Sequence, residues 1–478
     1  MTAPSESEPL ALERQTGYWP GPVAALNAAL VLCIGELLLL VGTKNLVFGS
    51  TTGGWEFNYF ADFQLRPLLT GIALSVALVP LAHLSLRLVQ RYQFAVLALW
   101  MTLGTAGQLI LRSLYGYSLA DIVGSEEANA YYGVSLKFRA YDLLSRYNEL
   151  ASSLPLHAKA NMPGKILLYH GLELITHNPQ TLAILVIVIS NLGGVLLYFI
   201  VSTLYNNRAV ALSALILYLF IPARVYFMPL LNVVTPVPVL ACLLLLSAFL
   251  ASRRKLLAVL MGAGLYAVLL FDPLPLSLGL FFVALATRSW WLGEVSASDL
   301  LWLVGLTAGS LVAIYLAFRF GLHFDAIERF LSVTAVLREF FGTQGRPYWL
   351  WVRANLVEFS LGAGVLPSLL CLLYLVTCAA GAIRGMRRRA EARPGLLSSL
   401  LSPGPLMLVT LLATLVALDL LGLNRGEVLR LWIFLMIFVE VVAAYFCSEK
   451  AGRWTLDIVL AGSIIQTAVT ISMVGFII

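Results

Sequence analysis

YGYSLADIVGSEEANAYYGVSLKFRAYDLLSRYNELASSLPLHAKANMPGKILLYHGLELITHNPQ, residues 115–180, is the longest polar stretch of this chain, and long apolar runs flank it on both sides. Ionisable side chains concentrate in it, among them Asp121, Glu126, Glu127, Asp142, Glu149, His157, Lys159, Lys165, His170, Glu173 and His177. Among apolar segments such groups are costly unless water or a polar ligand surrounds them. We therefore interpret residues 115–180 as the polar floor of a candidate active site.

The composition of the whole chain excludes an ordinary soluble domain. Of the 478 residues, 60% are hydrophobic and 12% are charged, and the mean hydropathy is +0.88. The apolar runs are continuous, whereas the strands of an outer-membrane barrel alternate apolar and polar residues. Because only helices and closed barrels satisfy their backbone hydrogen bonds in lipid, the sequence predicts an all-α polytopic membrane protein.

About 13 apolar runs are candidate transmembrane helices, since one crossing takes about 20 mostly apolar residues. They cover residues 22–48, 67–88, 92–114, 181–204, 208–222, 233–251, 256–271, 275–289, 299–319, 357–383, 404–422, 430–448 and 455–477. Residues 1–21 are polar and lack the order of a cleaved signal peptide, so we expect a cytoplasmic tail there. Residues 22–91 then hold two additional transmembrane helices, and residues 92–478 form the main transmembrane domain with the extracytoplasmic loop 115–180.

Basic residues at alternate connections predict the orientation of the chain. They are Arg87 and Arg91, Arg208, Arg253, Arg254 and Lys255, Arg288, several residues of the run 385–393, and Lys450 with Arg453. The positive-inside rule makes these connections cytoplasmic. We therefore expect a multi-pass protein of the plasma membrane, with a cytoplasmic N-terminus and an extracytoplasmic C-terminus. The segments with unusual polar chemistry then all fall on the outer face: 115–180, 223–232, 272–275, 320–356 and 423–429.

The net charge of +6 and the pI near 9.0 come largely from arginines beside apolar runs. This placement indicates contact with membrane lipid headgroups, and we expect no nucleic-acid partner. The five cysteines have no metal-ligand spacing. The stretch 115–180 also lacks a paired Asp-x-Asp motif. A divalent metal is left open without being indicated, and no cofactor is expected.

The polar stretch contains a predicted surface helix followed by a constrained turn. Residues 134–153 place apolar side chains at helical spacing opposite charged ones, which predicts an amphipathic helix in the membrane plane. In LPLHAKANMPGK, residues 154–165, prolines and a glycine restrict the backbone around His157 and Lys159, and Lys165 begins the next helix. A cationic turn at the membrane edge suits an anionic lipid headgroup. A plain juxtamembrane turn is the alternative.

Two further segments carry candidate binding residues. LNRGEVLR, residues 423–430, places Arg425, Glu427 and Arg430 at the mouth of an apolar run. Arginine forks hold phosphate oxygens, and a glutamate between them can orient a guanidinium. Interfacial anchoring is the alternative for Arg425. RPYWLWVRANLVEF, residues 346–359, adds Arg346, Tyr348 and Trp349, whose type suits a sugar or acceptor as well as an ordinary aromatic belt.

Carboxylates near the predicted membrane edge are candidates for a general base. Asp121 follows the run 92–114 by a few residues, and Glu126 and Glu127 are close rivals. A carboxylate in such a place can accept a proton from a hydroxyl. Asp272, in FDPLP, is a possible acceptor or sugar contact, and capping of the following helix is the alternative.

Three motifs resemble those of one enzyme family. LPLHAKANMPGKILLY, residues 154–169, resembles the HAxxHPPG-type loop of the GT-C superfamily of membrane glycosyltransferases, multispan enzymes that use polyprenyl-phosphate sugars. Residues 422–438 and 346–359 resemble two later segments of a bacterial branch of that superfamily. The resemblance covers roughly residues 92–448, and it places the chain as a distant relative of the protein mannosyltransferase and aminoarabinose transferase type.

The resemblance implies a GT-C-like bundle and an inverting transfer of a sugar from a polyprenyl-phosphate donor to a glycan, lipid or protein hydroxyl on the outer face. The base would be Asp121, Glu126 or Glu127. The lipid phosphate and donor would contact His157, Lys159, Asn161, Lys165, Arg425, Glu427 and Arg430.

The chain departs from the family pattern at two positions. Asn161-Met162 stands where relatives have His-Pro, and Asn232 stands where we expect an acid. An asparagine can exchange hydrogen bonds but cannot carry charge. These departures leave open a changed donor or a non-catalytic lipid-binding or assembly protein. A lipid or solute transporter is a separate alternative.

Overall fold

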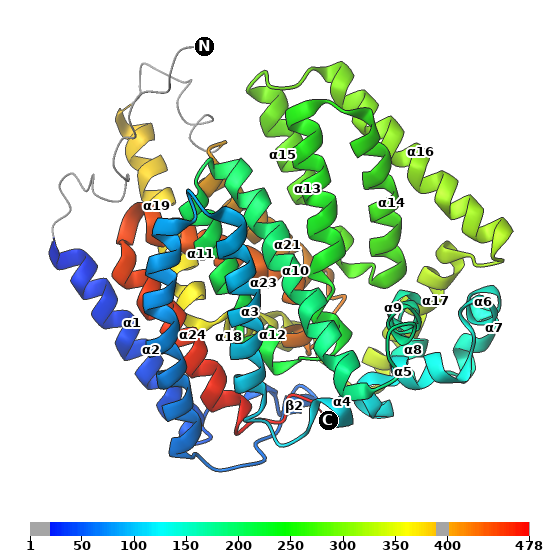
Figure 1. Ribbon diagram of the computed structural model, residues 1–478, viewed down its shortest axis with the longest axis horizontal. Coiled ribbons are helices and arrows are strands. Elements are labelled where there is room, and N and C mark those ends of the chain that lie inside the picture. Colours follow the sequence, from blue (N-terminus) through cyan, green and yellow to red (C-terminus); the bar gives the residue numbers. More distant parts are fainter. Residues whose placement is uncertain (1–19, 389–400, 478) are drawn as a thin grey trace.

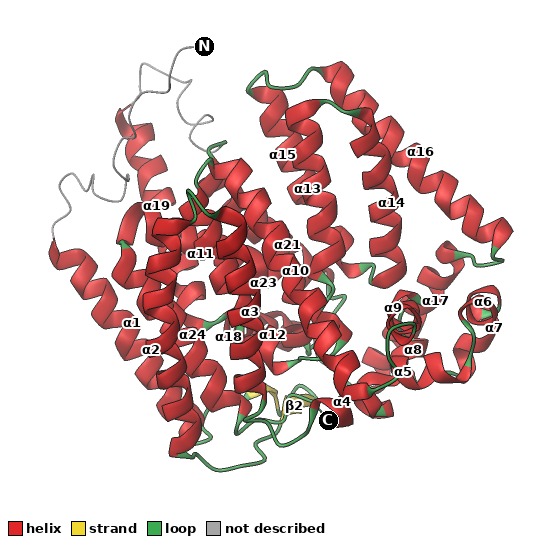
Figure 2. Ribbon diagram, in the orientation of Figure 1, coloured by secondary structure: helices red, strands yellow, loops and turns green. Residues whose placement is uncertain are grey.

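The structure is a computed structural model that describes residues 20–388 and 401–477. The predicted tail 1–21 lies outside the described residues except for Pro20 and Gly21, which begin α1, and so does most of the basic run 385–393. Figures 1 and 2 show a molecule built of helices, with one short β-hairpin near the C-terminus. This architecture confirms the prediction of an all-α polytopic membrane protein at the level of secondary structure.

Up to the end of the polar stretch, long helices come first and short helices follow. The first part contains α1 (Pro20–Gly42), β1 (Phe48–Ser50), β2 (Trp55–Phe57), α2 (Leu65–Leu88) and α3 (Gln93–Arg112). The polar stretch contains α4 (Leu119–Gly124), α5 (Glu126–Lys137), α6 (Ala140–Ser145), α7 (Tyr147–Leu150), η2 (Ala151–Ser153), α8 (Leu156–Lys159) and α9 (Gly164–Glu173). The strands pair antiparallel, with Phe48 opposite Phe57.

The remaining elements are mostly long. The middle part contains α10 (Pro179–Tyr205), α11 (Arg208–Leu219), α12 (Pro222–Tyr226), η3 (Leu231–Val233), α13 (Pro236–Ser252), α14 (Lys255–Phe271), η4 (Leu274–Leu278), α15 (Gly279–Trp291), α16 (Ala297–Gly321) and α17 (Ala326–Thr343). The last part contains α18 (Tyr348–Ala363), α19 (Val365–Arg388), α21 (Pro403–Leu421), α22 (Val428–Leu431), α23 (Ile433–Phe446), the π-helical turn η5 (Cys447–Ala451) and α24 (Arg453–Ile471).

Eleven helical segments of the described chain are long and apolar enough to cross a membrane. The other two predicted spans, 256–271 and 430–448, correspond to α14, with 17 residues, and α23, with 14. At about 1.5 Å per residue, α23 is about 21 Å long and shorter than the hydrocarbon core of a bilayer. The prediction of about 13 spans therefore counted two helices that fall short of this length.

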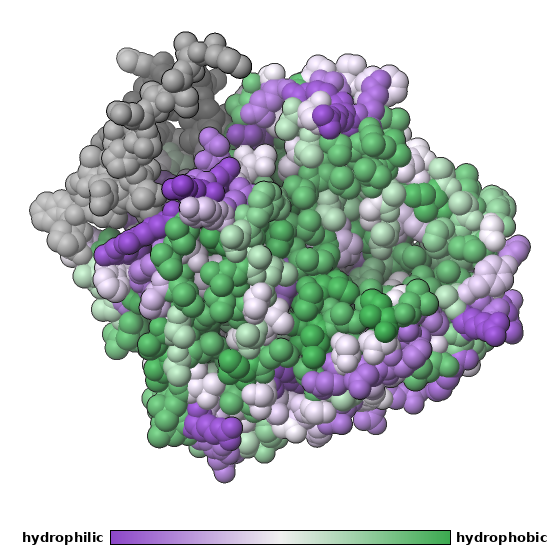
Figure 3. Space-filling model, viewed as in Figure 1, coloured by the Kyte–Doolittle hydropathy of each residue, from purple (hydrophilic) through white to green (hydrophobic). Residues whose placement is uncertain are grey.

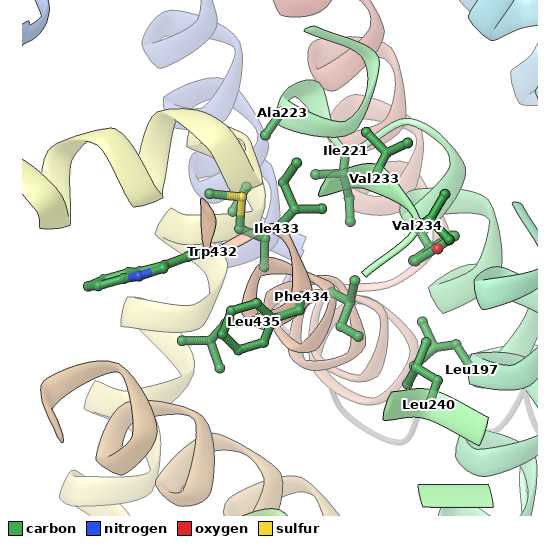
Figure 4. Close-up of a cluster of buried hydrophobic side chains, with 14 of the residues drawn as sticks. Leu197, Ile221, Ala223, Val233, Val234, Leu240, Trp432, Ile433, Phe434 and Leu435 are labelled. Atoms are coloured by element: carbon green, nitrogen blue, oxygen red, sulfur yellow. The ribbon is translucent and has the colours of Figure 1, made fainter. Parts of the chain in front are cut away.

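α23 forms the centre of the bundle. Nearly all its side chains are buried, from Ile433 to Ala444, and an apolar helix that is buried on all sides belongs to a core and not to a lipid-facing surface. Figure 4 shows its first turns, Ile433 to Leu435, packed among side chains of α10, α13 and the segment 221–234. Continuous apolar sequence looks the same in a buried helix and in a lipid-facing helix, so the burial of α23 is not visible in its sequence.

The two additional helices at the N-terminal side pack into the same bundle. Both α1 and α2 contact α24, the last helix of the chain. In Figure 1, α1, α2, α3, α11, α19 and α24 lie together, α13 to α16 form a second group, and α10, α21 and α23 lie between the groups. The short helices α5 to α9 lie with α17 beside the ends of α14 and α16.

Two sequence predictions about helix boundaries are wrong. The predicted amphipathic helix over 134–153 is divided among α5, α6 and α7, because the backbone at Phe138 and Arg139 is extended. Two tyrosines of this segment also differ in burial, since Tyr147 is buried while Tyr141 is exposed. The predicted span 357–383 is likewise broken at Gly364, whose φ of +104° ends α18 before α19 begins.

The C-terminal residues are built into the fold through Tyr115. The Tyr115 hydroxyl donates to the Ile477 carbonyl at 2.7 Å and accepts from the Ile477 N–H at 3.0 Å. The chain before Ile477 pairs with the segment after β2, through Phe60 N–H to Met473 O and Gly475 N–H to Asn58 O, both at 2.9 Å. Tyr115 thus fastens the start of the polar stretch to the last described residues.

We expect Tyr115→Phe to lower the free energy of unfolding by about 1–3 kcal/mol, because it leaves two buried backbone groups of Ile477 without their partner. Equilibrium denaturation in mixed micelles measures this loss. Tyr117→Phe is the matched control, since Tyr117 is 62% exposed, and it should change stability by less than about 0.5 kcal/mol. Equal effects of the two substitutions would refute a structural role for the Tyr115 hydroxyl.

The surface divides into apolar and polar regions. Figure 3 shows a broad apolar band across the helices, with polar residues gathered above and below it. α16 illustrates the band, since only 6% of its most apolar window is buried inside the protein. Such a surface is unstable in water and suits the hydrocarbon core of a bilayer. The chain is therefore a multi-pass membrane protein.

Candidate functional site

A small cavity of about 30 Å³ lies where the polar stretch meets the segments 230–232 and 430–431. Its lining residues are Ala128, Asn129, Tyr131, His157, Asn161, Lys165, Leu230, Asn232, Arg430 and Leu431. One water needs roughly 10–15 Å³ by this measure, so the closed part of the cavity admits about two water-sized groups. Two oxygens of a phosphate group, or the edge of a sugar ring, match this size, whereas the rest of either ligand would extend beyond it.

The turn between α8 and α9 places the Lys165 side chain at the cavity. Pro163 is the N-cap of α9 and Gly164 is its first residue. A β-carbon on Gly164 would lie 2.5 Å from the Leu270 carbonyl oxygen, so only glycine lets α9 approach the end of α14 this closely. The next residue, Lys165, therefore lies against Asp272, which follows α14.

Lys165 forms a buried ion pair in the wall of the cavity. Its side chain is 2% exposed, and its Nζ lies 3.2 Å from Asp272 Oδ2 and 3.0 Å from Asn161 Oδ1. Burial would lower the pKa of Lys165, but Asp272 and then Tyr131 outweigh this effect and raise the pKa above its ordinary value. Lys165 is thus a permanent cation at the cavity, and Asp272 acts as its counter-ion.

Asp272 also has a structural role, because its Oδ1 accepts from the Leu274 N–H at 3.2 Å, at the start of η4. This contact resembles the capping alternative, although Pro273 occupies the N-cap position of η4. As a direct sugar or acceptor contact, Asp272 stays a prediction, since its second oxygen faces Lys165.

The second cation of the cavity is Arg430 of α22, and a tight turn precedes this helix. Gly426 and Glu427 have φ values of +88° and +62°, and a β-carbon on Gly426 would lie 2.9 Å from the Trp351 ring. This tight turn places the Glu427 carboxylate between two arginines. Its Oε1 lies 3.3 Å from Arg346 Nη2 and its Oε2 lies 2.5 Å from Arg430 Nη2.

The charged groups at the site are arranged in pairs. The cavity wall holds two cations, Lys165 and Arg430, and each is paired with a carboxylate, Asp272 or Glu427. Because each cation is ion-paired with a carboxylate, the cationic groups keep a fixed geometry. Together with the amides of Asn161 and Asn232 in the lining, this arrangement is chemically suited to an anion with several oxygen acceptors.

His157 is the third basic residue of the lining and is neutral at pH 7. Burial, and after it the nearby Arg430 cation, lowers the pKa of His157 to about 4 from the ordinary 6.5, against the opposing effect of Glu427 and of a hydrogen bond with the Glu127 backbone. A neutral imidazole offers one donor and one acceptor nitrogen. His157 is thus a polar but uncharged side chain in the cavity wall.

This shift predicts a pH dependence of stability. Because the folded-state pKa lies below the unfolded value, the unfolded chain binds more protons between about pH 6.5 and pH 4. The free energy of unfolding should therefore fall by about 3 kcal/mol as the pH drops through this window, and stay level above it. Denaturation at several pH values measures the slope. His157→Gln should flatten it, and an unchanged slope in this variant would contradict the assignment to His157.

The remaining predicted binding residues lie near the cavity in different roles. Arg425 donates from Nη1 to the Arg346 carbonyl at 3.0 Å, and its guanidinium carbon lies 5.6 Å from the centre of the Tyr348 ring. Arg346 in turn donates to the Arg425 carbonyl at 2.7 Å, so the two arginines join their turns reciprocally. The Tyr348 hydroxyl donates to the Leu420 carbonyl, and Trp349 is 71% exposed.

The three predicted bases differ in their placement. The Asp121 carboxylate accepts from the Ser118 N–H at 3.1 Å and from its hydroxyl at 2.7 Å, which forms a capping box at the start of α4. Glu126 and Glu127 are exposed in the first turn of α5. Because the Glu127 backbone is bonded to His157 and the next residue, Ala128, lines the cavity, Glu127 lies at the rim, and Asp121 is committed to its helix cap.

Sequence reasoning missed Arg329, which holds the 157–161 turn in place. Arg329 of α17 is 1% exposed, and its guanidinium donates to the carbonyls of Ala158, Lys159 and Asn161. It also lies 5.0 Å from the centre of the Tyr147 ring. Nothing in the surrounding sequence DAIERF marks this arginine, since its partners are backbone groups about 170 positions away. The role expected of Lys159, a phosphate contact, stays a prediction.

No set of three His, Cys, Asp or Glu side chains within residues 20–388 and 401–477 is arranged to hold a metal ion. The cations of the site come from side chains instead.

Comparison of this chain with protein-family models, with curated proteins and with solved structures gives no match.

Proposed function

We propose that this protein is a membrane glycosyltransferase that moves a sugar from a polyprenyl-phosphate donor to a hydroxyl acceptor at the outer face of the plasma membrane. The cavity is the observation that carries the proposal. Lys165 and Arg430 stand in its wall, each with a carboxylate counter-ion, beside the neutral His157 and several amides. A phosphate at the end of a lipid chain is an anion of fitting size and place.

The apolar surface supports a lipid-linked ligand. The helix pair α16 and α17, which begins at Ala297, exposes large apolar side chains such as Leu301, Phe320 and Leu331. Arg329 of the same α17 binds the turn that carries His157. A lipid whose chains lie along this apolar surface can therefore place its phosphate near the cavity, at the boundary between apolar and polar surface.

In the proposed reaction, an acceptor hydroxyl attacks the anomeric carbon of the sugar while the bond from this carbon to the phosphate oxygen breaks. Arg430 and Lys165 stabilise the charge on the departing lipid phosphate. The hydroxyl proton passes to a carboxylate. Glu127 is our choice of base over Asp121 because it lies at the cavity rim, and Glu126 is the next candidate. The transfer inverts the configuration at the anomeric carbon.

A second function is favoured by one observation. The carboxylates closest to the cations, Asp272 and Glu427, are bound in ion pairs, so neither is free to act as a base. A protein that only binds a lipid phosphate would have the same features. The two proposals differ in whether Glu127 or Glu126 is required for turnover.

The test is sugar transfer by the purified protein in lipid nanodiscs, with a panel of radiolabelled polyprenyl-phosphate sugars and a membrane-lipid or glycan acceptor mixture. Glu127→Gln, Glu126→Gln and Asp121→Asn are compared with the wild type. We expect turnover in the wild type, loss of at least about a hundred-fold in Glu127→Gln, which matches the share of a general base, and near-normal turnover in Asp121→Asn.

Turnover that falls only in Glu126→Gln would move the base by one residue. Tight binding of a bare polyprenyl phosphate with no turnover of any donor would favour the binding protein. Failure to bind any polyprenyl phosphate would refute both functions.

A further inference from the structure

Asn129 has a buried hydrogen-bond acceptor without a partner. The residue is 1% exposed and lines the cavity. Its side-chain nitrogen is fully used, since Nδ2 donates to the Tyr169 hydroxyl at 2.7 Å and to the Val123 carbonyl at 3.2 Å. Within the described part of the chain, no donor lies within hydrogen-bond distance of its Oδ1.

The orientation of this amide is fixed by its surroundings. If the amide were rotated by half a turn, its oxygen would face the Val123 carbonyl oxygen, and two acceptors would oppose each other. The Val123 carbonyl therefore keeps Nδ2 on its own side, and Oδ1 stays unpaired. The Tyr169 hydroxyl, itself buried in α9, holds the amide from a second direction.

The local backbone also singles out Asn129. Its φ and ψ of −151° and 62° interrupt α5, which is helical before and after it. The interruption brings Ala128, Asn129 and Tyr131 to the cavity wall together, although residues two apart on a regular helix do not share a face. A buried acceptor that lacks a partner is unfavourable, so a donor supplied by a ligand would bind here with a gain.

We propose that Asn129 Oδ1 accepts a hydrogen bond from a hydroxyl of the sugar that the lipid phosphate carries. This inference rests on the proposed function, because it takes the phosphate to be held by Arg430, Lys165 and His157 in the same cavity. The oxygen has almost no surface that water reaches, and Asn129 lines the cavity, so a sugar hydroxyl reaches it as the cavity wall adjusts around the bound ligand. Asn129 is thus a specificity-determining residue that distinguishes a sugar-bearing lipid from the bare lipid phosphate, which lacks this hydroxyl.

The experiment compares the binding of two kinds of probe to the full-length protein in nanodiscs. One is farnesyl phosphate, and the other is a set of farnesyl phosphates that carry glucose, mannose or arabinose. In the wild type we expect at least one sugar-bearing lipid to bind about ten-fold more tightly than farnesyl phosphate. In Asn129→Leu this preference should disappear, while the affinity for farnesyl phosphate stays within about two-fold, since the phosphate contacts are intact.

Asn148→Leu is the matched control. Asn148 lies in the same polar stretch, and its Oδ1 is likewise buried without a partner among the described residues, but its Nδ2 contacts Glu328 and the Asp325 carbonyl away from the cavity. This variant should keep the preference. Tyr169→Phe is a second test that retains Asn129 and only loosens its amide, and it should reduce the preference part of the way.

The outcomes separate this inference from the proposed function. Binding of farnesyl phosphate without any preference for a sugar in the wild type would overturn the role of Asn129 and leave the phosphate site intact, as would a preference that survives in Asn129→Leu and Tyr169→Phe. If the wild type binds none of these lipids, the phosphate site and this inference both fail.

Discussion

Replacing Lys165 by methionine is expected to lower the free energy of unfolding by about 3–5 kcal/mol, the usual cost of removing one partner of a buried ion pair. The reason is the carboxylate that remains. Asp272 is only 13% exposed in its side chain, and it would be left in the protein interior with no cation 3.2 Å away. Methionine has a similar length to the lysine stem, so the effect reports the charge and not a cavity. Equilibrium denaturation in mixed micelles measures it.

Two controls separate the burial of this pair from charge in general. Arg146→Met removes the cation of the exposed pair Arg146–Glu149, whose side chains are 64% and 74% exposed, and it should cost less than about 1 kcal/mol. The double variant Lys165→Met with Asp272→Leu removes both charges and should recover a large part of the lost stability. A Lys165→Met protein as stable as Arg146→Met would contradict the buried pair, and so would a double variant that is less stable than the single one.

Replacing Arg430 by glutamine is expected to weaken the binding of farnesyl phosphate by about 10–100-fold. Hydrogen bonds to a charged group contribute roughly 1.5–3 kcal/mol, and each 1.4 kcal/mol corresponds to a factor of ten. The fold should survive, because Glu427 keeps its contact with Arg346 at 3.3 Å when Arg430 is lost. Titration of the lipid into labelled protein in nanodiscs gives the dissociation constant.

Arg425→Gln is the matched control for Arg430. It removes an arginine five residues away whose guanidinium binds the Arg346 carbonyl and the Tyr348 ring instead of the cavity. We expect less than about a three-fold change in the dissociation constant. Comparable losses in the two variants would mean that the phosphate binds to the whole basic turn, and the cavity would then not be its site.

The membrane-spanning helices can be predicted from the sequence because each depends only on the apolar content of about 20 consecutive residues. The runs that become α10 and α13 are apolar over about 20 residues and need no partner to be recognised. α23 is equally apolar and yet forms the core of the bundle. The difference lies in which neighbours surround a helix, and no local window contains that information.

The candidate site could be predicted in part for the same reason. Chemistry and local turns selected His157, Lys165 and Arg430, and the family resemblance added Asn161. All four residues line one cavity. The contacts that hold them could not be predicted. Asp272 pairs with Lys165 over 107 positions, and Arg329 binds backbone carbonyls, which every sequence possesses.

Asp121 shows how one local pattern can fit two roles. Its position just after an apolar run matches a membrane-edge base, and it equally matches the third residue of a helix whose N-cap is Ser118. The sequence YSLAD contains both signals. In the structure the carboxylate serves as a cap, and Glu127, with the same charge and a weaker local pattern, has the better position beside the cavity.

The most direct test of this account is an experimental structure of the protein in nanodiscs with bound farnesyl phosphate. The account predicts phosphate density in the cavity, with its oxygens about 3 Å from the side-chain nitrogens of Arg430 and either Lys165 or His157, and with the farnesyl chain against the apolar helices. Phosphate density elsewhere on the protein, with the cavity unchanged, would contradict the central claim that this cationic cavity is the binding site of a lipid phosphate.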